Sequence, residues 1–422
     1  MFVNKHTALS THIIVIVLML VMVPATAKAD DVVDKVKAER EKTRAFLVEL
    51  GATHEEATKI VPKDEDCATC HIEHFKEWAQ DAPHYQGISF ARVAYNHFVR
   101  DMRANGLKTD RKVMSTCDRC HAPTLQRYCS DKLYEAVTNI IGEDTEDAKV
   151  KANEKLNILR SIGVGCMECH TAQMTGNQDG PRYGTIKDAK SPHATKHAPE
   201  MAKSEYCAKC HAMNAKDSEA IRSAKIGKSQ LIWCALNYDD WKLAGSKQQC
   251  QECHMEKIGS RHSHSFPGAN NAEFLKKAVD ISVSGLKLSS ETAAIKINAH
   301  NKAGHMIPEG CILMADVVLT LTVKDDAGKT LFSTERIWYS QSKGFLPFVF
   351  SPELKEVPRT PAVWTIDDYI RSAALQAGDN VVDISFIVPT NVKKLTVEAD
   401  MGYRQKGKTA PMTKITKELT LL

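Results

Sequence analysis

Ten of the 13 cysteines in this 422-residue chain lie in five copies of one five-residue pattern, CxxCH. The copies are Cys67–His71, Cys117–His121, Cys166–His170, Cys207–His211 and Cys250–His254. Two thiols three positions apart can each bond to one vinyl group of a haem, and the adjacent histidine can ligate the iron. Zinc ribbons use paired CxxC without a systematic following histidine, and redox CxxC motifs occur singly. The pattern therefore predicts five covalently bound haem c groups.

The residues predicted to hold these groups follow directly from the motifs. The attachment cysteines are Cys67, Cys70, Cys117, Cys120, Cys166, Cys169, Cys207, Cys210, Cys250 and Cys253, and the proximal iron ligands are His71, His121, His170, His211 and His254. The first cysteines of successive copies are 50, 49, 41 and 43 residues apart. Each haem thus has too few residues around it for an apolar core of its own. We expect the haems to form the core, to lie close together, and to be required for folding.

A strongly apolar segment near the N-terminus predicts export. Residues 13–23 form an uninterrupted apolar run of 11, which follows Lys5 and precedes Ala27-Lys28-Ala29, a small-x-small cleavage pattern. The run is too short to span a bilayer comfortably. We therefore predict that residues 1–29 are a cleaved signal peptide, with a retained anchor as the alternative, and that the mature protein is periplasmic or extracellular.

The charge balance excludes one class of partner and predicts another. Lys plus Arg exceeds Asp plus Glu by 56 − 52 = +4, and no dense basic run is present, so a nucleic-acid partner is excluded. Without Lys5 and Lys28 the counts are 54 and 52, so the exported polypeptide is nearly neutral. Haem propionates would then make the faces near the haem edges acidic, which predicts a lysine-rich patch on a redox partner. The expected partners are a membrane-side electron donor and a periplasmic or extracellular acceptor, and a homo-oligomer remains open.

The second axial ligand of each iron separates an electron carrier from an enzyme, because an open iron can do chemistry. Ten further histidines follow the signal segment, enough to fill every site. His97 lies beside an apolar stripe at helical spacing, formed by Ile88, Ala91, Tyr95, Phe98 and Met102. It is therefore either a haem-facing ligand or an ordinary histidine at the edge of a core.

Two segments resemble multihaem cytochromes of the tetrahaem cytochrome and hydroxylamine oxidoreductase superfamily. Cys67–His71 followed by Trp78 and His84 resembles the start of the tetrahaem cytochromes associated with hydroxylamine oxidation, although a serine usual near the tryptophan is missing. Ser191-Pro192-His193, ahead of Ser204–Cys207, is similar to a stretch that recurs in cytochromes related to hydroxylamine oxidoreductase. The resemblance implies that His84 and His193 are distal iron ligands.

Two later segments extend this resemblance. His264–Gly268 is similar to the histidine, phenylalanine, glycine signature of the same superfamily, with His262 as the rival of His264. Asn301–Gly310 resembles the Asn, Gly-His, Pro-x-Gly element at the start of a C-terminal sandwich, with Pro-Glu-Gly in place of the usual Pro-Thr-Gly. His264 and His305 are thereby implied as further distal ligands.

The chain divides into four parts by pattern. Residues 1–29 are the signal peptide, 30–65 a helical lead-in, 66–268 the pentahaem domain and 269–422 a β-sandwich domain. The haem domain is expected to be mainly α with little regular sheet, including helices at 133–141 and 145–161. Seven strands are expected at 279–288, 292–299, 315–323, 330–339, 380–388, 394–399 and 415–421, which is typical of an immunoglobulin-like sandwich.

Three functions fit these observations. The first is an exported pentahaem cytochrome that transfers electrons along closely packed, mostly bis-histidine haems in a respiratory chain. The second is a haem-dependent reductase or oxidase of a small nitrogen or sulfur oxyanion at one five-coordinate haem; the third is a subunit of an extracellular cytochrome filament. Cys129, Cys234 and Cys311 belong to no motif, and in an oxidising compartment two of them could form a disulfide.

Overall fold

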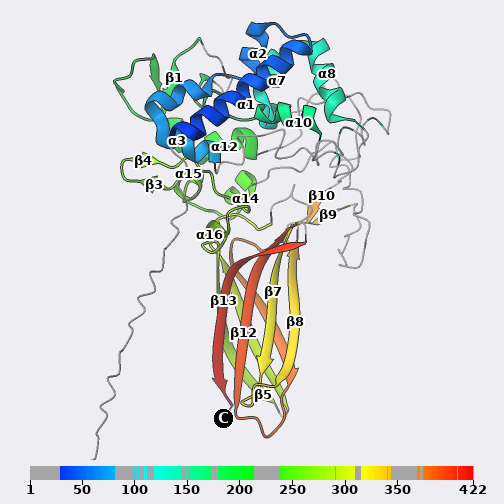
Figure 1. Cartoon of the computed structure of the whole chain (residues 1–422). Helices are drawn as coiled ribbons and strands as arrows, with labels where there is room; N and C mark the ends of the chain where they lie inside the picture. Colours follow the sequence, from blue (N-terminus) through cyan, green and yellow to red (C-terminus); the bar gives the residue numbers. More distant parts are fainter. Residues whose placement is uncertain are drawn as a thin grey trace, which may run out of the picture.

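The structure is a computed structural model in which a helical region is followed by a β domain (Figure 1). It describes residues 29–80, 118–143, 153–172, 179–212, 237–289, 291–308, 315–339, 341–343, 368–370, 374–405 and 407–421, with the single positions 99, 103, 109, 111, 149 and 176. Within these residues, no helix is long and apolar enough to cross a membrane. The predicted signal segment lies outside them.

Helices and short turns make up most of the described part of the first 275 residues. They are α1 (Ala29–Glu49), α2 (His54–Ile60), η1 (Asp64–Cys67), α3 (Ala68–Gln80), α7 (Pro123–Tyr128), α8 (Asp131–Ile141), α10 (Glu154–Ile158), η3 (Leu159–Ser161), α11 (Cys166–Cys169), η5 (Pro199–Ala202), α12 (Ser204–His211), α14 (Asn237–Leu243), α15 (Cys250–His254) and α16 (Ala272–Leu275). Two small ladders accompany them: β1 (Arg182–Gly184) pairs in parallel with β2 (Thr195–His197), and β3 (Lys257–Ile258) pairs with β4 (Arg261–His262).

The lead-in helices pack on an apolar cluster that includes Leu47, Ile60, Leu125, Leu133 and Leu159. The sequence sets their ends. Glycine follows α1 at position 51 with a φ of +106°, a conformation that side chains with a Cβ rarely adopt. The side chain of Thr53 accepts a hydrogen bond from the Glu56 amide and so caps α2. A separate cluster of Val36, Ala68, Phe75 and Trp78 packs α1 against the segment that carries the first CxxCH motif.

The helix expected over 145–161 is not continuous, which corrects the prediction. Asn153 has an extended backbone (ψ 112°), and its side chain accepts a hydrogen bond from the Leu156 amide, so a new helix, α10, begins there. Asparagine is a strong N-cap because its short side chain competes for backbone hydrogen bonds. The periodicity of the apolar residues continues through this position, which is why the sequence pattern suggested one helix.

The β domain is built from two antiparallel sheets that share one core. The first sheet has the order β11–β6–β5, and the second has the order β13–β12–β7–β8. The strands of the two sheets are β5 (Val279–Ser289), β6 (Thr292–Asn301), β7 (Ala315–Lys324), β8 (Thr330–Tyr339), β11 (Gly378–Ile387), β12 (Lys394–Gln405) and β13 (Lys408–Thr420). A separate short ladder joins β9 (Gln341–Lys343) to β10 (Asp368–Ile370). The helical first part and the antiparallel sheets of the second agree with the predicted order of a mainly α region followed by a β region.

Alternation of apolar and polar residues explains why these strands form. Along β6, Ile295, Ile297 and Ala299 are buried in the common core, whereas Lys296 is exposed. Neighbouring side chains of a strand point to opposite faces, so every second residue faces the other sheet. Figure 1 shows the two sheets extending from the helical region toward the C-terminus. The end of the β domain that carries the start of β5 and the end of β6 therefore lies next to the haem-motif helices.

Candidate haem-binding sites

Short helices present the CxxCH motifs. Cys67 ends η1 and Cys70 lies in α3, where a kink with non-helical backbone angles falls at His71. The third, fourth and fifth motifs lie in α11, α12 and α15. Positions i and i+3 share one face of a helix, so both thiols of a motif point the same way. None of the described motif cysteines forms a disulfide with another described cysteine. Of the second motif, Cys120 and His121 are described, and Cys117 lies outside the described residues.

The proximal histidine of the first motif faces a predicted distal ligand. The ring centroids of His71 and His193 are 6.5 Å apart, with 49° between the ring planes. Nδ1 of His193 lies 3.3 Å from the Ala194 carbonyl oxygen. These two residues are 122 positions apart, and β1, which pairs with the strand after His193, is joined to the third motif by a hydrogen bond from the Tyr183 amide to the His170 carbonyl oxygen.

The third motif shows the same arrangement more tightly. The rings of His170 and His264 are stacked at 6.2 Å with 18° between their planes. Nδ1 of His170 lies 2.8 Å from the Tyr183 carbonyl oxygen, and Nδ1 of His264 lies 3.0 Å from the His262 carbonyl oxygen. His262 itself is exposed and directs Nδ1 to the Met255 carbonyl oxygen. Of the two candidate ligands His262 and His264, it is His264 that lies next to the third motif.

The fifth motif faces a histidine of the β domain. The rings of His254 and His305 are 6.4 Å apart with 19° between their planes. Nδ1 of His254 lies 2.7 Å from the Pro267 carbonyl oxygen, and Nδ1 of His305 lies 2.9 Å from the Met306 carbonyl oxygen. Burial lowers the pKa of His305 to about 4, as it does the pKa of His264. Both side chains are therefore neutral near pH 7, the state that binds a metal.

These three pairs fit an iron between two imidazoles. A histidine nitrogen lies about 2 Å from a metal, so two opposed rings on one metal have centroids a little over 6 Å apart. In His170, His254, His264 and His305, Nδ1 lies close enough to a main-chain carbonyl oxygen to donate a hydrogen bond to that oxygen. A proton on Nδ1 leaves the Nε2 lone pair for the metal.

Two of the predicted distal ligands cannot be placed. His84 and His97 lie outside the described residues, so their relation to the second and fourth motifs is not described. His211 of the fourth motif has Nδ1 at 3.1 Å from the Asn237 side-chain oxygen, which orients its ring in the manner of the other proximal histidines. His121 of the second motif is described at the end of a short helical segment.

Cysteines of different motifs approach one another closely. The thiols of Cys67 and Cys166 are hydrogen-bonded, and both lie within 4.8 Å of a carboxylate oxygen of Asp64. Equivalent thiol contacts join Cys207 to Cys250, and the Cys120 thiol also lies 3.9 Å from the Cys210 carbonyl oxygen. The first motif is thus next to the third, the second next to the fourth, and the fourth next to the fifth.

Tyr206 completes this chain of contacts. Its hydroxyl donates a hydrogen bond to the Cys169 carbonyl oxygen, which joins the fourth motif to the third. Its ring lies under the Lys209 amino group, 3.9 Å from the ring centroid. Burial raises the pKa of Tyr206, so its hydroxyl stays protonated as a donor. The first motif therefore contacts the third, and the third contacts the fourth. The second and fifth motifs both contact the fourth.

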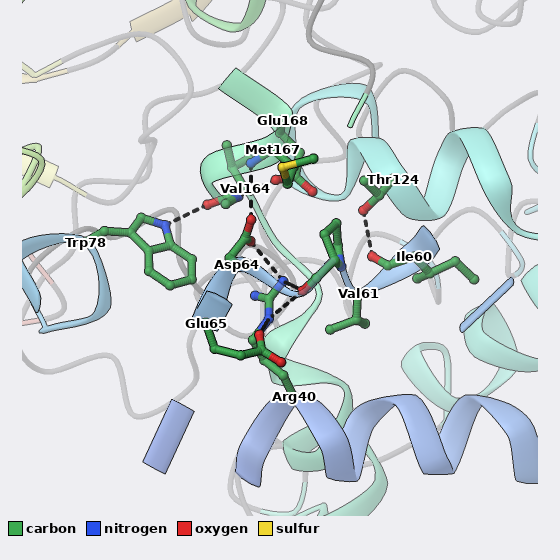
Figure 2. Close-up of polar contacts among 12 residues, drawn as sticks. Arg40, Ile60, Val61, Asp64, Glu65, Trp78, Thr124, Val164, Met167 and Glu168 are labelled. Carbon is green, nitrogen blue, oxygen red and sulfur yellow. Dashed lines mark hydrogen bonds and ion pairs between the residues drawn. The ribbon is translucent and has the colours of Figure 1, made fainter. Parts of the chain in front are cut away.

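A buried charged cluster lies between the first and third motifs (Figure 2). The Arg40 guanidinium is 2.9 Å from Asp64 and 3.3 Å from Glu65, and it also donates to the Pro62 carbonyl oxygen. Asp64 accepts a hydrogen bond from the Met167 amide inside the third motif. Burial raises the pKa of Asp64, and the charge of Arg40 opposes that rise. Asp64 therefore ties α1 to both motifs.

Glu168, between the two cysteines of the third motif, belongs to the same cluster. Its carboxylate accepts a hydrogen bond from the Gly165 amide at 2.7 Å. Burial, followed by the nearby charge of Asp64, raises the pKa of Glu168 to about 8. Sequence reasoning missed this cluster, because an acidic run such as Asp64-Glu65-Asp66 ahead of a motif is typical of a solvated face.

Glu77 is a second residue that sequence reasoning missed. One of its carboxylate oxygens accepts hydrogen bonds from the His264 amide and from Arg261, both at 2.8 Å. His74, one turn earlier on α3, packs its ring edge against His264 at 4.6 Å. Glu77 and His264 are 187 positions apart, so no local pattern could have linked them.

Comparisons with known proteins support the motif assignment. Residues 66–143 match the family of cytochrome c554 and c-prime. The structure resembles that of a penta-heme cytochrome c552 from Thermochromatium tepidum, with a TM-score of 0.57 and 16% identity over 86% of this chain and 100% of that chain. The chain has the fold of a multihaem c-type cytochrome. No curated protein matches its sequence.

A further structural match is weak. A glycosyl hydrolase family 2 member from Bacteroides cellulosilyticus aligns with 34% of this chain and 14% of that chain, at 9% identity and a TM-score of 0.18. A likeness of this size describes neither the fold nor the function. The multihaem fold and the five CxxCH motifs agree on covalently bound haem c, and the spatial arrangement of His71, His170 and His254 is compatible with it.

Proposed function

We propose that the chain is an exported pentahaem c-type cytochrome that transfers electrons through closely packed, mostly bis-histidine haems in a respiratory chain. The observation that carries the proposal is the recurrence of one geometry: three motif histidines each face a second histidine at 6.2 to 6.5 Å. Bound haem supplies a one-electron iron couple at each such site.

The residues that would hold each group follow from the motifs and the ring pairs. The first site has Cys67, Cys70, His71 and His193; the third has Cys166, Cys169, His170 and His264; the fifth has Cys250, Cys253, His254 and His305. The second and fourth sites have their own motifs, with His84 and His97 as the remaining proposed ligands. A histidine on each side leaves no open position for a substrate, which favours electron transfer over catalysis.

The chain's own side chains do three things at these sites. Hydrogen bonds from Nδ1 to main-chain carbonyls hold the imidazoles of His170, His254, His264 and His305 in one orientation and one tautomer. Burial lowers the pKa of His264 and of His305, which keeps these two distal rings neutral. The contacts between motif residues follow a continuous order, which supports a path for electrons that branches at the fourth motif.

Export and the nature of the β domain are also part of this proposal. Residues 1–29 would direct the chain to the periplasm or beyond, where haem is attached to CxxCH motifs. The strand orders β11–β6–β5 and β13–β12–β7–β8 support an immunoglobulin-like sandwich. Counted along the β domain, β5, β6 and β11 are its first, second and fifth long strands, and these three lie in one sheet in sandwiches of that class. His305 would then fasten this sandwich to the haem domain.

Low-temperature EPR with near-infrared magnetic circular dichroism on the oxidised holoprotein tests the proposal, after a pyridine haemochrome assay of the haem count. We expect five haems per chain, all low-spin and bis-histidine. A high-spin signal from about one haem in five would instead favour the oxyanion reductase or oxidase, with nitrite and hydroxylamine as the first substrates to assay. Filaments seen by microscopy at high concentration would favour the polymer subunit.

A further inference from the structure

The segment from Arg182 to His197, which contains β1 and β2, is strongly basic. Its charged residues are Arg182, Lys187, Lys190 and Lys196 against Asp188, which gives 4 − 1 = +3 with both of its histidines neutral. The three lysines are exposed. Asp188 has a φ of +53°, so the chain reverses sharply at this point and carries Lys187 and Lys190 outward on the turn.

This basic segment also carries the histidine that faces the first motif. His193 lies three residues from Lys190 and three from Lys196, and its ring is 6.5 Å from that of His71. An extended strand rises about 3.3 Å per residue, so both lysines lie on the order of 10 Å from His193 along the chain. β1 lies at the outer edge of the helical region, away from the β domain (Figure 1). The first site is therefore close to a positively charged outer surface.

This surface combines exposed positive charge with one exposed apolar side chain. Ile186 is 72% exposed between the basic residues, which is unusual for a large apolar side chain. Lys196 lies over the ring of Tyr183 at 5.4 Å. Among the described residues, Lys187, Lys190 and Lys196 take part in no ion pair. Exposed charges of one sign steer the encounter with a partner of opposite sign, and an exposed apolar side chain can be buried in the contact.

The sign of the charge identifies the partner. Propionates would contribute two negative charges near the first motif, and the segment's +3 exceeds them. The three exposed lysines therefore offset the negative charge that propionates would add at this surface. We propose that residues 182–197 are the docking surface for an acidic electron-transfer protein, which exchanges electrons at the first motif. This inference rests on the proposed electron-transfer function, and it concerns the partner and the place of entry.

The test uses charge reversal of exposed lysines in the holoprotein. One variant carries K187E, K190E and K196E. The control carries K329E, K393E and K394E, three exposed lysines at the end of the β domain where β12 begins, of which Lys394 lies 3.9 Å from Glu418. The probe is a plant-type ferredoxin, an acidic iron–sulfur electron carrier. Its binding to oxidised cytochrome is measured by titration calorimetry at two ionic strengths, and electron transfer from the reduced probe is followed by stopped flow.

We expect the unmodified protein to bind ferredoxin with an affinity that falls as salt is added. The K187E/K190E/K196E variant should lose about tenfold or more in affinity and in association rate, and the control should stay within about twofold. Equal losses in both variants, unchanged binding in the first, or no binding by the unmodified protein would each overturn the docking surface. Binding of phosphatidylglycerol vesicles in place of ferredoxin would overturn it in favour of a membrane.

Reduction by dithionite separates a failure of the docking surface from a failure of the proposed electron-transfer function. Dithionite, a small reductant that needs no docking surface, is added to each variant and the haem absorption is followed. If dithionite reduces all variants alike while ferredoxin discriminates among them, both proposals stand. If the haems accept no electrons from dithionite in any variant, the electron-transfer function fails whatever the binding result.

Discussion

The rings of His254 and His305 face each other at 6.4 Å with 19° between their planes, although His254 ends α15 and His305 belongs to the β domain. The Asn301 side chain holds this part of the β domain by donating to the His305 and Leu375 carbonyl oxygens. Gly304 has a φ of +74°, and a Cβ there would lie 2.7 Å from the Ser246 side chain. The two domains therefore meet closely where the fifth motif finds its second histidine.

Replacing His305 with alanine tests this junction. We expect about one haem in five to become high-spin, because the fifth site loses one of its two imidazoles. We also expect a lower thermal midpoint, because the β domain loses an anchor to the helical region. EPR of the oxidised protein measures the first effect and calorimetry the second. His300→Ala is the control, since that ring is exposed on β6 beside Asp379. Loss of a low-spin signal in both variants would contradict the assignment.

Glu77→Gln should change the third site without removing a ligand. Glutamine keeps an oxygen that can accept from the His264 amide, but it removes a negative charge close to that histidine. A lost negative charge favours the reduced iron, so one reduction potential should rise by on the order of 1 kcal/mol, roughly 40 mV. Potentiometric titration with EPR measures this shift. Glu73→Gln, on the same helix but exposed and paired with Lys76, should leave the potentials unchanged.

Asp64→Asn should destabilise the helical region. The change leaves Arg40 buried with less charge compensation, although Glu65 and the Pro62 carbonyl oxygen remain. Removing one partner of a buried ion pair lowers the free energy of unfolding by about 3 to 5 kcal/mol. Because Arg40 keeps its other partners, we expect a loss of about 3 kcal/mol. Denaturant unfolding of the holoprotein followed by far-UV circular dichroism gives the difference. Asp66→Asn is the matched control, because Asp66 is exposed. Equal stability of the two variants would show that Asp64 is neutral in the native protein.

The sequence predicted the parts of this molecule that depend on local chemistry. The alternation in Val279-Asp-Ile-Ser-Val and the turn at Asp326-Ala-Gly328 placed β5 and the β7–β8 hairpin to within a residue or two, because strand burial and turn geometry are encoded by near neighbours. The motifs predict the attachment residues for the same reason. His193, His264 and His305 were named from family resemblance, and the structure brings each to a different motif.

What sequence could not supply depends on long-range packing. The Arg40–Asp64 pair and the Glu77–His264 contact join positions 24 and 187 residues apart, and neither has a periodic signature. The break at Asn153 was missed because apolar spacing continued through it, and the local capping preference of asparagine prevailed. Which histidine faces which motif also depends on how α3, α11 and α15 pack together, and spacing along the chain does not determine that.

Cys129 offers a test of burial that is independent of the motifs. Its thiol is 1% exposed, and burial raises its pKa to about 12, with the Glu56 charge as the next cause. The thiolate is the reactive form, so native protein at pH 8 should leave Cys129 unmodified by iodoacetamide. Peptide mapping by mass spectrometry distinguishes it from Cys234 and Cys311. Modification of Cys129 only after denaturation is the expected result, and rapid labelling in the native state would contradict it.

The same thiol predicts how stability depends on alkaline pH. In the unfolded chain the thiol loses its proton near its ordinary pKa of 9.0, whereas the native thiol keeps it up to about 12. Between these values the native state binds more protons than the unfolded state, so stability falls as pH rises. The slope for one group is about 1.4 kcal/mol per pH unit. Denaturant unfolding of the native sequence and of Cys129→Ala at pH 8 and pH 10.5 measures it. The free energy of unfolding of the native sequence should fall between pH 8 and pH 10.5 by more than that of the alanine variant, because alanine has no proton to lose. If the difference in unfolding free energy between the two proteins stays constant with pH, Cys129 ionises equally in the native and unfolded states.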